Sequence, residues 1–133
     1  MATLSSLLGA GFASAVGATG ATGAVPGARV GSTGSTSTIT PNASLYDTYV
    51  INGLATPATI ATPSGSPVDG QRLVLRFKDD GTARALTWAG ATGAYCAVGM
   101  TLPSTTVSSK TLYVGCVYNS AAGFWDAIST VQE

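Results

Sequence analysis

From Leu45 onward, apolar and polar residues alternate in short runs, which is the pattern of β-strands that bury one face. The clearest run spans residues 71–78, where Leu73, Leu75 and Phe77 alternate with polar and basic side chains. Further strands are expected over residues 45–51, 58–61, 82–88, 95–98, 111–118 and 123–130. Short strands at such regular spacing predict an all-β fold, an antiparallel β-sandwich or a jelly-roll-like domain, over residues 45–133.

Short polar segments are expected to turn the chain between these strands. Asn52-Gly53 is a strong turn signal after the first strand, and Asp69-Gly70 closes the loop before the third. Asp79-Asp80-Gly81 is expected to join the strands on either side of it in a hairpin. The short connection at residues 119–123 predicts a second hairpin, between the last two strands.

The first sixteen residues carry apolar side chains at the i, i+3, i+4 and i+8 spacing of a helix, namely Leu4, Leu7, Leu8 and Phe12. Two glycines within this stretch weaken any helix by about 1 kcal/mol each. No Lys or Arg precedes it, which disfavours a secretory signal peptide. We interpret residues 1–16 as an apolar anchor peptide that docks onto a neighbouring subunit, with a disordered tail as the alternative.

Residues 17–44 are rich in glycine, threonine and serine, with glycines at Gly17, Gly20, Gly23, Gly27, Gly31 and Gly34. The glycine spacing changes between three and four, whereas a collagen triple helix requires glycine at every third position. Only Pro26 falls among these glycines, which also disfavours a triple helix. We therefore expect an extended Gly-rich arm that lies along other chains, with a flexible linker as the alternative.

The composition of the chain excludes several classes of function. Ala, Thr, Gly and Ser fill 71 of the 133 positions, and charged residues make up 9%. Six basic residues balance six acidic ones, which argues against electrostatic binding of nucleic acid or of an acidic membrane surface. The chain has no histidine, so histidine-dependent nucleophiles and histidine-ligated metals are excluded. We expect no enzyme activity, no catalytic residue, no cofactor and no metal.

Three groups of side chains are the remaining candidates for chemistry. Asp69, Asp79 and Asp80 supply too few oxygen ligands for a calcium site and are more typical of turns. Cys96 and Cys116 lie in expected strands, and we expect them to be buried free thiols that pack as small apolar groups. A disulfide between them is the alternative if the two strands are neighbours. Five aromatic residues occupy strand positions, namely Trp88, Tyr95, Tyr113, Tyr118 and Trp125. Aromatic residues at alternating strand positions are typical of a core, and stacking on sugars in a binding module is the alternative.

Several short segments of the chain carry a resemblance to known proteins. The opening residues 1–9 and the Gly-Ala-Thr repeats after them are similar to the starts of small virion proteins of tailed bacteriophages with collagen-like leaders. Other segments are similar to a β-domain that recurs at the C-terminal end of such proteins, namely residues 39–42, 67–71, 77–82, 85–88, 110–113, 118–119 and 125–126. The resemblance implies a trimeric structural component of the virion, with no catalytic residues to carry over.

The arm and the resemblance together lead to one functional hypothesis. We expect a homotrimeric capsid decoration, or cement, protein of the virion surface, assembled in the host cytoplasm, whose arms staple major capsid subunits. Leu4, Leu7, Leu8 and Phe12 are the expected capsid anchors, with the glycines as the tether. The alternative is a short head or tail fibre whose tip recognises host surface glycans through loops 63–70 and 90–93, with Tyr95. A secreted adhesin is a third reading, resting on the signal-like N-terminus alone.

Overall fold

A computed structural model describes residues 27–133, which contain nine β-strands and no helix. In chain order the strands are β1 (Val30–Thr33), β2 (Thr38–Ile39), β3 (Thr48–Leu54), β4 (Ala58–Ile60), β5 (Arg72–Asp79), β6 (Leu86–Trp88), β7 (Tyr95–Ala97), β8 (Thr111–Asn119) and β9 (Phe124–Gln132). The all-β prediction is therefore confirmed for the part of the chain that the structure describes.

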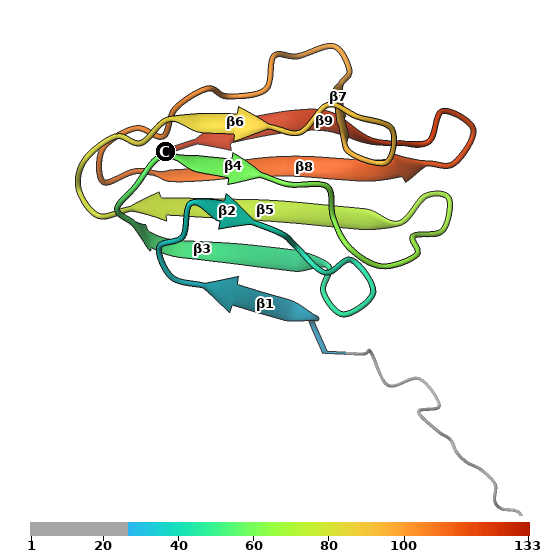
Figure 1. Cartoon of the computed structure of the whole chain (residues 1–133), viewed down its shortest axis with the longest axis horizontal. Helices are drawn as coiled ribbons and strands as arrows, with labels where there is room; N and C mark the ends of the chain where they lie inside the picture. The colour runs from blue at the N-terminus through green and yellow to red at the C-terminus, as the bar shows by residue number, and fades with distance from the viewer. Residues whose placement is uncertain (1–26) are drawn as a thin grey trace, which may run out of the picture.

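The strands form two sheets that share one core (Figure 1). The larger sheet has the order β1-β3-β5-β8-β9-β7, and the smaller one has the order β2-β4-β6. From β1 to β6 each strand is followed by one in the other sheet, and the stacked strands of each sheet are parallel. This part of the chain thus makes three turns of a coil.

Residues of the same kind lie beside one another in successive turns of this coil. Thr38, Thr59 and Thr87 are register partners on the exposed side of the small sheet. Their neighbours Ile39 and Ile60 are register partners on its buried side. β-branched residues suit such a half-buried pleated surface, so the alternation of Thr and Ile explains both the strands and the face that each buries.

The core lies between the two sheets. Leu73, Leu75 and Phe77 of β5 are fully buried, and they belong to the same apolar cluster as residues of the small sheet. Burial of each such side chain contributes about 1.5–3 kcal/mol. Trp88 is partly buried against this cluster. Its ring packs edge-on against Phe77, with ring centroids 5.9 Å apart, and against Tyr95, with ring centroids 5.1 Å apart.

The strand directions differ from the predicted antiparallel sandwich or jelly roll. Of the seven strand pairings within residues 27–133, five are parallel, and only β5–β8 and β8–β9 are antiparallel. The β8–β9 hairpin was predicted and is confirmed. The hairpin across Asp79-Asp80-Gly81 is wrong, because the chain crosses there to the small sheet, where β6 pairs with β4.

The predicted turn at Asn52-Gly53 is also wrong. Both residues lie within β3, whose register with β5 shifts between Ile51 and Leu54. Gly53 has a φ of 65°, a conformation that glycine adopts without the strain of a Cβ atom. The dipeptide therefore forms an irregularity in a continuing strand and not a reversal of the chain.

The folded domain begins within the segment 17–44 that was expected to be an extended arm. β1 pairs with β3, β2 pairs with β4, and Ile39 and Ala43 are buried in the core. Gly31 permits close packing here, because a Cβ atom at this position would lie 2.6 Å from the ring of Tyr46. Residues 30–43 are thus part of the domain, and the arm prediction does not apply to them.

Candidate functional site

The predicted site residues fall into three groups. Leu4, Leu7, Leu8 and Phe12, together with Gly17, Gly20 and Gly23, lie outside the described residues. Gly27 and Gly34 are exposed, with nothing within 4 Å of a Cβ atom added to either. Gly31 is buried in β1. The structure therefore packs Gly31 closely, leaves Gly27 and Gly34 open, and does not join the three into one site.

Arg29 attaches the start of the described chain to the domain. Its Nε donates to Asp47 Oδ2 at 2.9 Å, and its Nη1 donates to the carbonyl oxygen of Ser44 at 3.0 Å. The backbone carbonyl of Arg29 also accepts a hydrogen bond from the Asp47 amide at 2.8 Å. The hydrogen bond from Arg29 lowers the pKa of the Asp47 carboxyl. We call these contacts the Arg29 clasp, which fixes the position at which the chain enters β1.

Sequence reasoning did not identify the clasp. Arg29 is the only charged residue among the first 46, and Asp47 is the next one along the chain. The isolation of a single cation in an otherwise uncharged segment was the available signal. Its partner could not be named from the sequence, since the two residues are 18 positions apart and the first turn of the coil brings them together.

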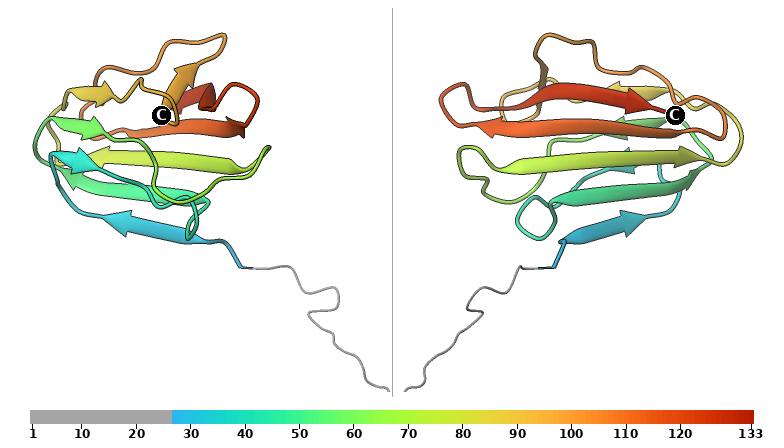
Figure 2. Two further views of the ribbon diagram at one scale, coloured as in Figure 1. Left: turned by 45° about the vertical axis from the view of Figure 1, so that its right-hand side comes forward. Right: turned by 180° about the vertical axis from the view of Figure 1, so that it is seen from behind.

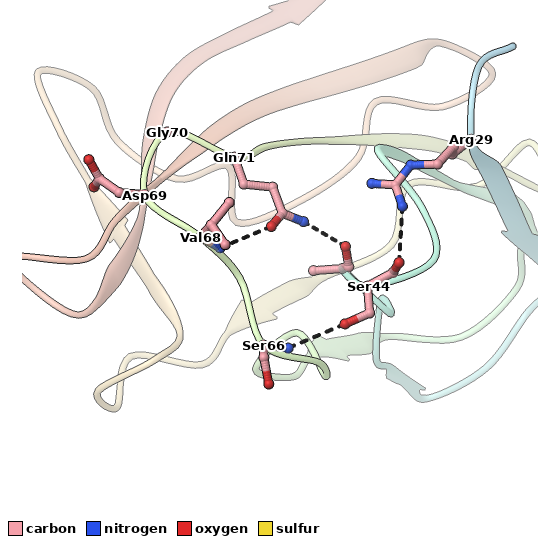
Figure 3. A pocket seen from close by; sticks show the side chains of 8 residues that line it. Arg29, Ser44, Ser66, Val68, Asp69, Gly70 and Gln71 are labelled. Atoms are coloured by element: carbon pink, nitrogen blue, oxygen red, sulfur yellow. Dashed lines mark hydrogen bonds between the residues drawn. The ribbon is translucent and has the colours of Figure 1, made fainter. Parts of the chain in front are cut away.

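A shallow cleft of about 490 Å³ opens beside the clasp (Figure 3). The Gln71 side chain links two of the segments that line the cleft. Its Nε2 donates to the carbonyl oxygen of Ala43 at 2.6 Å, and its Oε1 accepts from the Val68 amide at 3.1 Å. The Ser66 amide donates to Ser44 Oγ across the cleft at 3.3 Å. The lining residues are Arg29, Ala43, Ser44, Ser66, Val68, Asp69, Gly70 and Gln71.

The cleft offers hydrogen-bonding groups of several kinds: hydroxyls, backbone carbonyls, a guanidinium and a carboxylate. Four of its residues come from loop 63–70, which the sequence analysis assigned to the glycan-binding alternative. Loop 90–93 does not line it. Tyr95 is 3% exposed and its hydroxyl donates to the carbonyl oxygen of Ala61 at 3.1 Å, so this residue is a core residue and not a contact for a ligand.

Asp79 is the one carboxylate in the buried part of the described domain. Its Oδ1 accepts from the amides of Gly81 at 3.0 Å and Ser109 at 2.9 Å, and its Oδ2 accepts from the Thr106 hydroxyl at 2.8 Å. Burial acts to raise the pKa of Asp79, but the hydrogen bonds from Ser109, Thr106 and Gly81 outweigh it and lower the pKa overall. These bonds give Asp79 a structural role at the end of β5.

The other two aspartates of the sequence cluster have separate partners. Asp80 pairs with Arg84, with Nη2 2.8 Å from Oδ2, and this contact lowers the pKa of the Asp80 carboxyl. Asp69 accepts from the Ser120 amide at 3.0 Å. Within residues 27–133, no three Asp, Glu, Cys or His side chains are grouped so that they could hold a metal ion.

The two cysteines are free thiols in different environments. Cys96 is exposed on β7, and Cys116 is buried on β8. Burial raises the pKa of Cys116 to about 12, and the nearby negative charge of Asp126 contributes. Because β9 lies between β7 and β8, the strands that carry the cysteines are not neighbours, which was the condition for a disulfide.

The aromatic residues mostly serve the core, as the sequence favoured. Tyr95 and Trp125 are buried, and Trp88 and Tyr118 pack against the same cluster. Tyr113 is the exception, with 38% of its surface exposed on the side of β8 that points away from the core. The Arg76 guanidinium lies over its ring, 6.0 Å from the centroid.

The side of the six-stranded sheet that points away from the core is not covered by any other segment of residues 27–133 (Figure 2, right). We call it the outer face. On β5 it carries Arg72, Val74, Arg76 and Lys78, which alternate with the buried residues of that strand. The alternation on β5 was visible in the sequence, but the sequence did not show which residues of β8 and β9 lie beside it.

Searches against protein-family models, characterised proteins and solved structures found no match to this chain. No helix within residues 27–133 is long and apolar enough to cross a membrane.

Proposed function

We propose that this protein is a bacteriophage head decoration protein, a homotrimer on the capsid surface that staples major capsid subunits through an N-terminal arm. The observation that carries the proposal is the Arg29 clasp, which holds the chain at the β1 edge of the domain. The 26 residues on the N-terminal side of the described domain contain no charged side chain. A leader of this composition is suited to lie against another protein, because it brings no charge that must be desolvated.

The mechanism of such a protein is mechanical. Each arm buries modest apolar area on a capsid subunit, at about 25 cal/mol per Å². Linking several arms through one oligomer raises the overall affinity by ~10²–10⁴, because each later contact forms at high effective concentration. The protein would assemble onto the shell in the host cytoplasm, with self and the major capsid protein as its partners. Nucleic acid, membrane and cofactors have no part in the proposal.

The anchor assignment is tested with shells of the major capsid protein that lack this protein. A full-length variant with Leu4, Leu7, Leu8 and Phe12 all changed to Ser should lose at least ~100-fold in shell binding, since the multivalent gain disappears. Its circular dichroism should match that of the parent. The matched control is Leu45→Ser, which removes an exposed apolar side chain from the domain itself. Undiminished binding of the anchor variant would refute the proposal.

The second candidate function is a short head or tail fibre that recognises host surface glycans. The cleft of Figure 3 favours it, because its hydroxyl, carboxylate and guanidinium groups suit a hydroxylated ligand. Asp69→Ala should then reduce the binding of labelled protein to host cells, while Asp80→Ala, away from the cleft, should not. Copy number separates the two functions, since decoration requires hundreds of copies in each virion and a fibre requires a few tens or fewer.

A further inference from the structure

The outer face of the six-stranded sheet combines apolar side chains with a regular distribution of charge. Val74, Val117 and Tyr113 lie near its middle, and each is only partly buried or exposed. Val131 of β9 is 63% exposed on the same side. Cations lie on β5 and a carboxylate lies on β9, with β8 between them.

Strand register arranges these residues in rows that cross the sheet. Arg72 pairs with Val117, which pairs with Asp126, so one row reads cation, apolar residue, anion. Two residues further along, Val74 is in register with Gly115, a position without a side chain. A third row contains Arg76, Tyr113 and Val131. The charges of the first row thus lie on opposite sides of β8.

The two charges of the first row lack opposite-charge partners within the described domain. Neither Arg72 nor Asp126 makes an ion pair in residues 27–133, where the three pairs are Arg29–Asp47, Lys78–Glu133 and Arg84–Asp80. Asp126 accepts one hydrogen bond, from Asn119 Nδ2 at 3.1 Å. Two strand spacings, about 10 Å, separate Arg72 from Asp126 within one chain.

A rotation axis that runs along β8, in front of the outer face, would bring these charges together between copies. Such an axis leaves height along the strand unchanged and places β5 of one copy opposite β9 of the next. Arg72 of one copy then meets Asp126 of another, while Tyr113 and Gly115, which lies beside the Ser129 hydroxyl, are near the axis. Any axis in this direction produces the same pairing, whether it relates two copies or three.

The size of the outer face is suitable for self-association. The six strands range from three to nine residues in length, and at about 4.8 Å between strands and ~3.4 Å per residue they give a face of roughly 650 Å². Standard protein interfaces bury about 800 Å² on each partner. The partly apolar centre and the charges beside it also match the usual distribution, in which polar groups surround a more apolar middle.

We propose that the outer face is the surface through which copies of this chain associate, around an axis along β8, with Arg72 of each copy paired to Asp126 of the next. The inference rests on the proposed function only for the number of copies, which is three. The pairing itself follows from the register of β5, β8 and β9.

The test is a charge reversal in the full-length protein, followed by sedimentation velocity over a range of concentrations. Arg72→Asp and Asp126→Arg should each weaken association about tenfold or more, because like charges then face each other. The double variant R72D/D126R restores opposite charges and should return to within about threefold of the parent. The control is Thr59→Asp, which adds a charge to the exposed side of the small sheet and should leave association unchanged.

The outcomes separate this inference from the proposed function. Folding of each variant is checked by its thermal unfolding midpoint. Association that is unchanged in both single variants, or not recovered in the double variant, would overturn the interface. A dimer that shows the recovery supports the interface and contradicts the trimer of the proposed function. A monomeric full-length parent overturns both.

Discussion

At the end of β5, the carboxylate of Asp79 links segments that are distant in the sequence. Through its three hydrogen bonds it holds the turn after β5 at Gly81 and two positions of the segment before β8, Thr106 and Ser109. The Thr106 hydroxyl in turn accepts from the Arg84 amide at 2.8 Å, next to β6. The residue read from the sequence as part of a hairpin turn is therefore a connection between the two sheets.

Replacing Asp79 with Ala should lower the free energy of unfolding by about 2–4 kcal/mol, since a buried hydroxyl and two partly buried amide hydrogen bonds lose their acceptor. The matched control is Asp80→Ala, which removes a neighbouring carboxylate that pairs with Arg84 near the surface, and should cost much less. Urea unfolding at neutral pH measures both. Equal effects of the two substitutions would contradict the role of Asp79.

Cys116 should be unreactive in the folded protein. In the Cys96→Ser variant, alkylation of the remaining thiol at pH 8 should be at least ~100-fold slower in the native state than in urea, because the thiolate is the nucleophile and burial raises its pKa to about 12. The rate of iodoacetamide incorporation, followed by mass spectrometry, checks this. A native rate within tenfold of the unfolded rate would mean that β8 opens readily.

At the scale of elements, the strands after residue 45 were predictable, whereas β1, β2 and all strand partners other than the β8–β9 hairpin were not. Alternation placed β4, β5, β7, β8 and β9 within a few residues, because each buries one face of a pleat. Strand direction depends on where the chain goes after each strand, and the local signals at Asn52-Gly53 and Asp79–Gly81 were overridden. A positive φ at Gly53 is used inside a strand, and Asp79 is bonded to a segment about 30 residues away.

The candidate site was less predictable than the fold for the same reason. The loop 63–70 was identified from its prolines and glycines, and it does line the cleft. The residues opposite, Arg29 and Ser44, were not, since the first coil brings them there through the pairing of β1 with β3. Likewise, the row that joins Arg72 to Asp126 depends on the register of three strands.

β1 offers a test of the boundary between arm and domain. Gly31→Ala should destabilise the protein by about 1–3 kcal/mol, because the added Cβ atom would lie 2.6 Å from the Tyr46 ring and force it to move. The control is Gly34→Ala, three residues further on, where nothing lies within 4 Å, and its effect should stay within about 0.5 kcal/mol. Thermal unfolding of both variants checks this, and equal midpoints would place residue 31 outside the packed domain.

For the whole molecule, the ionisable groups define a wide range of pH in which stability should be constant. The chain has no histidine, so no side chain of that type titrates between the carboxylates and the thiols. The pKa values of Asp47, Asp79, Asp80 and Glu133 are all lowered in the folded protein, chiefly by hydrogen bonds. Those of Cys116 and Tyr95 are raised by burial.

The sign of each shift determines where stability is lost. A carboxyl whose pKa is lower when folded stabilises the protein above its unfolded value, 3.8 for Asp and 4.5 for Glu, and this contribution disappears as the pH falls through the folded pKa. A thiol or phenol whose pKa is raised by folding stabilises the protein below its unfolded value, 9.0 for Cys and 10.0 for Tyr. The midpoint of urea unfolding should therefore be flat from about pH 5 to pH 8.5 and fall on both sides.

Two variants test which groups cause the loss of stability on the acid side and on the alkaline side of this pH profile. Asp79→Asn keeps the shape of the side chain and removes its titration, so its acid limb should be shallower than that of the parent. Cys116→Ala should flatten part of the alkaline limb, although it also removes buried volume and lowers the plateau. Because Asp79 and Cys116 lie at opposite ends of the β5–β8 pair, each substitution should leave the other limb unchanged. A profile that bends between pH 6 and pH 8 would require a titrating group that the folded domain does not contain.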